Sequence, residues 1–103
     1  MNASILVATG KTTVKDHKGG RIWLEGSKPN KAGMPVGTRY SVSYTQGCMT
    51  IRVDPNGAKP VAGKGVRAII DICGKSIADS LEMGSKVSVE YYHSMIVIKR
   101  ATT

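Results

Sequence analysis

One succession of predicted elements occurs twice in this chain: a strand, a glycine, a short helix, a second glycine and a two-stranded hairpin. The first copy spans residues 20–53 and the second spans residues 66–103. A unit of this length cannot close a hydrophobic core alone, whereas two units on one polypeptide can complete each other's sheets. The repeat therefore predicts a single object built from two similar halves.

The two copies align at nearly constant spacing. The hairpins align without gaps, with Gly37 matching Gly84, a shift of 84 − 37 = 47 residues. The leading strands align with Arg21 matching Arg67, a shift of 67 − 21 = 46 residues. One residue is therefore inserted in the second copy, in the region of residues 72–74.

Apolar alternation and turn residues give the predicted elements. We expect strands at 21–25, 39–45 and 48–53, and again at 67–72, 86–92 and 95–100, with a helical turn between Ser27 and Gly33 and a second helix over 76–83. The inward-facing hairpin residues are then Tyr40, Val42, Tyr44, Met49, Ile51, Val53, Val87, Val89 and Tyr91. The predicted fold class is mostly β with short helices, in which two fused strand–helix–hairpin halves form an intramolecular swapped-hairpin pseudo-dimer barrel.

The remaining segments are assigned within one domain, residues 1–103. Residues 1–19 are predicted to be an N-terminal arm or an edge strand, without a counterpart in the second half. Residues 54–65 are predicted to be a linker, since Pro55, Asn56 and Gly57 favour a turn and little after them is apolar.

Charge is the main compositional indicator of a partner. Fifteen Lys and Arg against seven Asp and Glu give a net charge of +8, which favours anionic partners, nucleic acid before an anionic membrane. The alternative is a basic surface with no such role. Because the charges form no run, we expect a basic face on a folded domain. No apolar run approaches transmembrane length, and no membrane partner is predicted.

Neither cysteine indicates a metal site or a disulfide. Cys48 and Cys73 stand alone, without a CxxC motif or a histidine at ligand spacing. We therefore predict reduced thiols, a cytoplasmic protein, and no metal or cofactor.

Several short motifs resemble a known family. Residues 22–26 (IWLEG), 32–37 (AGMPVG), the 40–44 strand and 47–51 (GCMTI) resemble the SymE-like toxin domain of the SpoVT/AbrB-like swapped-hairpin group. Residues 77–87 (IADSLEMGSKV) are similar to the general AbrB-type pattern. The chain departs from the family at Pro29, where leucine is usual, and at Met34, where phenylalanine is usual.

The charge of +8, the duplication and the resemblance together predict a non-catalytic nucleic-acid-binding protein that prefers duplex DNA to RNA. AbrB-like proteins contact DNA through basic residues of the first strand, its following loop and the short helix. The matching positions are Arg21, Lys28, Lys31, Arg67 and Lys75. Strand alternation adds Arg39 and Arg52 on the outward hairpin face. All seven are predicted to contact phosphate rather than bases.

Two other function classes stay open from the sequence. A phage or mobile-element protein that inhibits a host or defence protein would use a similar small basic domain. A SymE-like ribonuclease toxin would need a general base, for which His17 and His93 are the candidates, although both lie outside the matched motifs. The oligomeric state is left as a monomeric pseudo-dimer or a homodimer.

Overall fold

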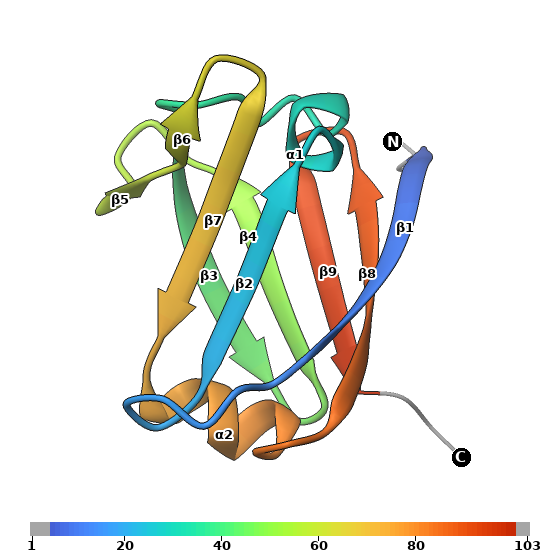
Figure 1. Ribbon diagram of the computed structural model, residues 1–103, viewed down its shortest axis with the longest axis vertical. Helices are drawn as coiled ribbons and strands as arrows, with labels where there is room; N and C mark the ends of the chain where they lie inside the picture. Colours follow the sequence, from blue (N-terminus) through green and yellow to red (C-terminus); the bar gives the residue numbers. More distant parts are fainter. Residues whose placement is uncertain (1–4, 101–103) are drawn as a thin grey trace.

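Two antiparallel β-sheets and two short helices make up the computed structural model, which describes residues 5–100 (Figure 1). The larger sheet has the order β1 (Leu6–Thr13), β8 (Lys86–Tyr92), β9 (Met95–Arg100), β4 (Cys48–Val53), β3 (Arg39–Thr45) and β5 (Lys59–Pro60). The smaller sheet has the order β2 (Arg21–Gly26), β7 (Arg67–Cys73) and β6 (Ala62–Lys64). The prediction of a mostly β fold with short helices is confirmed.

The hydrophobic core lies between the two sheets. Ile22 and Leu24 of β2 face the core, and every second residue of the larger sheet faces them from the other side. Of the predicted inward hairpin residues, Tyr40, Met49, Ile51, Val87, Val89 and Tyr91 are buried, whereas Val42, Tyr44 and Val53 are partly buried against the core. Strand alternation was therefore sufficient to predict the buried face of the two hairpins.

The helices lie at opposite ends of the molecule (Figure 1). Helix α1 (Lys28–Lys31) is a single turn that buries Pro29 near its start. Helix α2 (Lys75–Leu81) is shorter than the predicted 76–83, because Glu82 has a φ of 71° and takes the chain out of the helix. In the described residues, neither helix is long and apolar enough to cross a membrane.

The predicted arm and the predicted linker each contain one residue in an equivalent structural position, Val14 and Val61, and the sequence comparison missed this correspondence. The Val14 amide donates to the Ser85 carbonyl at 3.0 Å, and the Val14 carbonyl accepts from the Gly84 amide at 2.9 Å. Val61 makes the same two bonds with Thr38 and Gly37, each at 2.8 Å. The offset, 61 − 14 = 47, equals the offset of the hairpins. The predicted linker therefore contains β5, β6 and the buried Val61, and the predicted arm contains edge strand β1.

Pairing between the halves is centred on residues that the sequence comparison aligned. Leu24 of β2 lies opposite Ile70 of β7, and Thr50 of β4 lies opposite Val97 of β9. If a two-fold axis relates the halves, equivalent residues must lie opposite each other where the axis crosses a pair of strands, as these residues do. That both halves derive from one repeated unit stays a prediction. Closure of the two sheets into the predicted barrel is not shown: β1 and β2 do not pair with each other, and one isolated bridge joins Lys15, which follows β1, to Arg21.

Candidate binding surfaces

The seven predicted nucleic-acid contacts are distributed over several surfaces. The outer face of the smaller sheet carries Arg21 and Arg67, and the outer face of the larger sheet carries Arg39 and Arg52. The remaining three are on the helices at the two ends: Lys28 and Lys31 in α1, and Lys75 in α2. The structure therefore does not bring the predicted residues together on one face.

Arg21 is held by a carboxylate of the neighbouring strand. Its Nε donates to Asp71 Oδ1 at 2.9 Å and its Nη2 donates to Oδ2 at 3.0 Å, a two-point contact. The same guanidinium lies over the Trp23 ring, 4.7 Å from its centroid. The hydrogen bond from Arg21 lowers the pKa of Asp71, so this pair stays ionised at neutral pH.

Glu25 extends this network along β2. Its carboxylate accepts a hydrogen bond from Trp23 Nε1 at 3.0 Å and one from Arg67 Nε at 2.7 Å. These hydrogen bonds lower the pKa of Glu25, and the bond from Trp23 has the larger effect. Both arginines on this face are thus matched by carboxylates, and little net charge is left there for an anionic ligand.

Two more predicted contacts bind the protein's own backbone. Lys28 Nζ donates to the Thr9 carbonyl at 2.6 Å, and Arg39 Nη1 donates to the Gly57 carbonyl at 2.9 Å. Within residues 5–100, the side chains of Lys31, Arg52 and Lys75 have no hydrogen-bond or ion-pair partner and are exposed.

The larger sheet carries a band of basic side chains on its outer face. Five adjacent strands supply one each, and the five exposed residues are Lys11 (β1), Lys86 (β8), Lys99 (β9), Arg52 (β4) and Arg39 (β3). We call this set the basic face. The strand register places Lys99 across from Cys48, four residues from Arg52 along β4, so the band crosses the sheet diagonally.

Among residues 5–100, Glu90 is the one carboxylate within the strands of this sheet, and alternation places it on the outer face. It accepts hydrogen bonds from Tyr92 Oη at 2.9 Å and pairs with Lys99 Nζ at 3.2 Å. These contacts lower the pKa of Glu90, and the contact with Tyr92 has the largest effect. Five basic groups against one carboxylate leave a formal charge of 5 − 1 = +4 on the basic face, half of the +8 carried by the chain.

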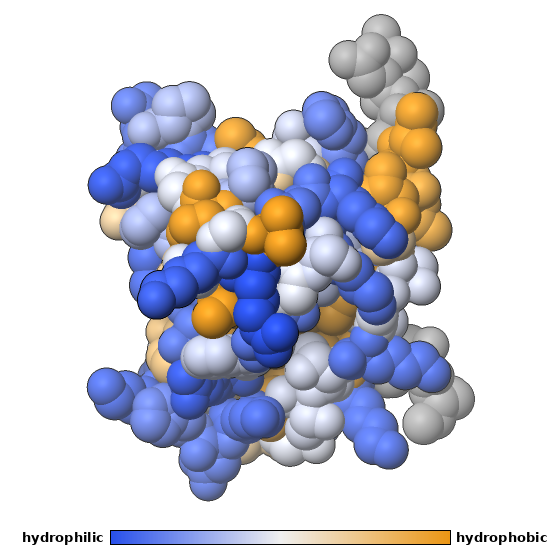
Figure 2. Space-filling model, turned by 45° about the horizontal axis from the view of Figure 1, so that its top comes forward, coloured by the Kyte–Doolittle hydropathy of each residue, from blue (hydrophilic) through white to orange (hydrophobic). Residues whose placement is uncertain are grey.

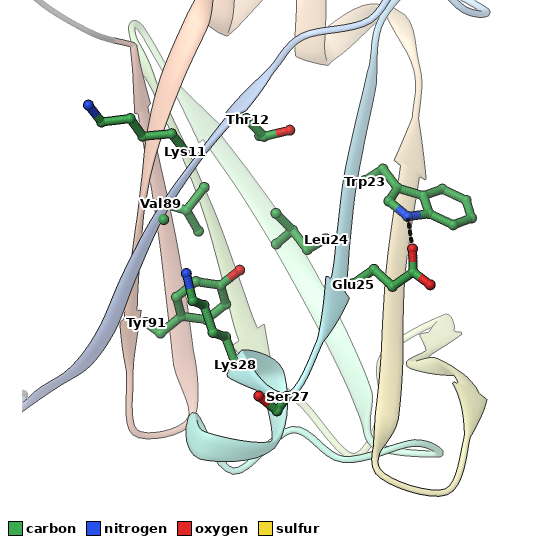
Figure 3. Close-up of a pocket in the computed structure, with 10 residues that line it drawn as sticks. Lys11, Thr12, Trp23, Leu24, Glu25, Ser27, Lys28, Val89 and Tyr91 are labelled. Atoms are coloured by element: carbon green, nitrogen blue, oxygen red, sulfur yellow. Dashed lines mark hydrogen bonds between the residues drawn. The ribbon is translucent and has the colours of Figure 1, made fainter.

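A cleft separates β1 from β2 beyond their single bridge (Figure 3). Its volume is about 450 Å³. Leu24, Val89 and Tyr91 form its floor, Thr12 and Lys28 lie along its sides, and Gly10 is a further lining residue. The Trp23 and Glu25 side chains point away from it, on the far side of β2 (Figure 3). Burial raises the pKa of Tyr91 to about 12, so its hydroxyl stays neutral at physiological pH. We call this feature the β1–β2 cleft.

The start of β1 exposes three consecutive apolar side chains. Ile5, Leu6 and Val7 are 72%, 49% and 39% exposed and form the hydrophobic patch at the right-hand edge of Figure 2. Because β1 is an edge strand, this patch adjoins unpaired backbone groups.

The two histidines are separated. His17 precedes β2, near α2, whereas His93 lies in the β8–β9 turn, at the end of the molecule that carries α1 (Figure 1). The structure therefore does not assemble the paired histidine site that the ribonuclease hypothesis requires. In the part of the chain described, no group of three or more His, Cys, Asp or Glu side chains is positioned to hold a metal ion.

Strand alternation contained the signal for the basic residues that sequence reasoning missed. Lys86 and Lys99 alternate with buried residues in the same way as Arg39 and Arg52, so the same rule assigns them to the outward face. Lys11 was missed because β1 was not assigned to this sheet.

No family model, curated protein or solved structure matches this chain. The resemblance to SymE-like and AbrB-like domains therefore stays a prediction.

Proposed function

We propose that this protein binds nucleic acid without catalysis, duplex DNA in preference to RNA, through the basic face. The observation that carries this proposal is the concentration of net positive charge there, with one basic residue on each of five adjacent strands and one carboxylate, Glu90, among them. The opposite sheet has its arginines paired with Asp71 and Glu25. Only Arg39 and Arg52 of the predicted contacts belong to the proposed surface.

The spacing of the basic groups suits a polyanion better than a small ligand. Neighbouring strands lie about 4.8 Å apart, and four residues along a strand span about 13 Å. Lys99 and Arg52 are separated by such an offset, so the band presents charges at intervals along an extended line. A phosphate backbone meets such a line with several contacts at once, which predicts binding that weakens steeply as salt rises.

Two double variants with equal charge loss test the surface. Arg52→Ala with Lys86→Ala removes two charges from the basic face, whereas Lys64→Ala with Arg67→Ala removes two from the opposite sheet. Binding to a labelled duplex of about 20 base pairs is measured between about 50 and 200 mM salt. The first variant is expected to lower the slope of log affinity against log salt by about 2, and the second to leave it within about 0.5 of the unmodified protein.

Two results would overturn the proposal as a whole, and a third would overturn its preference for DNA. Equal losses in both double variants would show that net charge alone attracts the nucleic acid. Absence of binding to duplex DNA and to single-stranded RNA at low salt would exclude nucleic acid as the partner. Tighter binding to RNA than to the duplex would overturn the preference for DNA.

The two free thiols support a cytoplasmic location. Cys48 and Cys73 are half-buried and form no disulfide, as expected for a protein in a reducing compartment.

The β1–β2 cleft favours a second candidate function, the binding of a partner protein. Unpaired strand edges on both sides of a cavity are a recognised means of holding an extended chain. This candidate includes the possibility raised by the sequence, that of a phage or mobile-element protein acting on a host or defence protein.

A further inference from the structure

We propose that the β1–β2 cleft binds an extended acidic segment of a partner protein, which adds as a β-strand along the edge of β1 or β2. This inference gives a site and a ligand chemistry to the protein-binding candidate and rests on it. It is independent of nucleic-acid binding by the basic face.

Backbone geometry shows which groups face the cleft. The carbonyls of Thr9 and Lys15 point away from β8: the first accepts from Lys28, and the second accepts from the Arg21 amide at 3.0 Å. Since every second residue of an antiparallel strand points to the same side, the amide and carbonyl of Lys11 and Thr13 also face β2.

The same alternation applies to β2. Arg21 uses its amide and carbonyl to pair with Lys15, on the side away from β7. Trp23 and Glu25 follow at two-residue intervals, so their backbone groups face β1. In residues 5–100, no strand pairs with these groups, because β1 pairs only with β8 and β2 only with β7 beyond the bridge. Two facing strand edges are therefore open to an incoming chain.

Lys28 occupies part of this site in the free protein. Its ammonium group reaches from the end of β2 across the cleft to the Thr9 carbonyl, which is one of the edge acceptors. An added strand would supply an amide donor to Thr9 in its place. The released ammonium would then be free to pair with a carboxylate of the ligand.

The surroundings of the cleft favour an acidic ligand with alternating polarity. Leu24, Val89 and the Tyr91 ring form an apolar floor that would contact every second side chain of an added strand. The intervening side chains would face solvent, with Lys28 at one end of the cleft and the exposed Lys15 at the closed end. The carboxylate of Glu25 is already paired with Trp23 and Arg67, so it would repel an acidic segment little.

Amide exchange measured by NMR tests strand addition directly. The probe is a pool of peptides of about eight residues, in which Asp or Glu alternates with Val, Ile, Thr or Tyr. At millimolar peptide, we expect exchange at the edge amides of β1 or of β2 to slow by at least about tenfold. The residues to monitor are Lys11 and Thr13 on β1, and Trp23 and Glu25 on β2. A second pool, with Lys in place of Asp and Glu, is expected to slow amide exchange by less than a third as much.

Two substitutions at Lys11 separate backbone pairing from charge. Proline removes the amide that faces the cleft but no β1–β8 hydrogen bond, so the sheet tolerates it, whereas Lys11→Ala removes only the charged side chain. If the peptide adds to β1, Lys11→Pro is expected to weaken binding at least tenfold relative to Lys11→Ala. If it adds to β2, both variants bind alike and only the Trp23 and Glu25 amides become protected.

Lys28→Met and the control Lys31→Met then test the cleft side chain. Both lysines belong to α1, but only Lys28 reaches the cleft. Only Lys28→Met is therefore expected to weaken the binding of acidic peptides, by threefold or more. The folded state of each variant is checked by its NMR spectrum.

Several results would overturn the inference. Unchanged exchange at all four amides with the acidic pool would exclude strand addition. Equal protection by the lysine pool would exclude an acidic ligand. Protection that appears without peptide and rises with protein concentration would assign the edges to a second copy of this chain. Competition by duplex DNA that is lost in the Arg52→Ala, Lys86→Ala variant would show that the peptide binds the basic face and not the cleft.

Discussion

Val14 and Val61 occupy equivalent corners of the molecule, each fixed by two backbone hydrogen bonds to the turn that precedes a hairpin. Both side chains are buried, at 1% and 2% exposure. At each corner the chain passes from the larger sheet to the smaller one, between β1 and Lys15 in one case and between β5 and β6 in the other. The corners therefore fix the relative positions of the sheets.

Truncation of either valine is expected to destabilise the protein by a similar amount. Val14→Ala and Val61→Ala each remove two buried methyl groups, which predicts a loss of about 1.5–3 kcal/mol in the free energy of unfolding. Urea unfolding followed by circular dichroism measures this loss. Val66→Ala is the matched control, since Val66 is 80% exposed and its truncation should cost less than about 0.5 kcal/mol. A cost at Val14 of the size of the control would contradict this role for the corner.

Gly57 is predicted to accept no side chain. A Cβ atom there would overlap the backbone carbonyl of Tyr40, so Gly57→Ala must displace strand β3. We expect a loss of about 3 kcal/mol or more in the free energy of unfolding. Gly10→Ala is the control, because its Cβ would meet only the mobile end of Lys28 at 3.2 Å and the Tyr91 ring at 3.8 Å. Equal thermal melting temperatures of the two variants would contradict the close approach at Gly57.

Stability is expected to fall at alkaline pH because two tyrosines are buried. Burial raises the pKa of Tyr40 and of Tyr91 from 10.0 to about 12. Their neutral forms are favoured by folding, so this contribution is complete below pH 10 and is lost as pH rises from 10 through 12. This rise in pKa from 10.0 to about 12 corresponds to about 2–3 kcal/mol per tyrosine in the free energy of unfolding. Urea unfolding between pH 8 and 12 measures the loss, and Tyr91→Phe should reduce it. A flat profile to pH 12 would exclude the burial effect.

Acid titration is expected to disrupt the network around Trp23. Hydrogen bonds from Arg21 and from Trp23 lower the pKa values of Asp71 and Glu25 below their ordinary 3.8 and 4.5. Groups with lowered pKa values stabilise the fold above the unfolded-state values and lose this effect as pH falls through the folded-state values. Emission from Trp23, the chain's only tryptophan, should therefore change with a midpoint below pH 4.5, the ordinary pKa of Glu25.

Glu25→Gln is the control for this titration. It keeps an acceptor for the Trp23 indole but has no charge to lose, so the remaining change in emission should follow Asp71 alone. An emission change centred above pH 5 in the unmodified protein would contradict the lowered pKa values.

Local patterns were sufficient for most elements of the fold. The predicted strand bounds at 39–45, 48–53, 86–92 and 95–100 agree with β3, β4, β8 and β9. These hairpins are amphipathic, so alternation fixes both their extent and their buried face. Residues 54–65 gave no such signal, because β5 and β6 are exposed and only Val61 between them enters the core.

The candidate site was less predictable, because ion pairs between distant residues decide which charges are available. Asp71 lies 50 positions from Arg21, and no local pattern indicates that it neutralises that residue. Similarly, Lys28 reaches Thr9 only because β1 crosses beside β2. The cleft is a product of strand order, and strand order depends on contacts between segments that are far apart in the chain.

The pairing of β1 with β8, β4 with β9 and β2 with β7 has a consequence for synthesis and folding. The paired residues of these ladders lie between 68 − 26 = 42 and 92 − 6 = 86 positions apart, so neither sheet can be completed until most of the chain has left the ribosome. Long loops must close before such pairing stabilises the chain, which predicts slow, cooperative folding for a protein of this size. Fragments cut in the exposed turn at 55–56 should each be unstructured alone and regain the fold only when mixed.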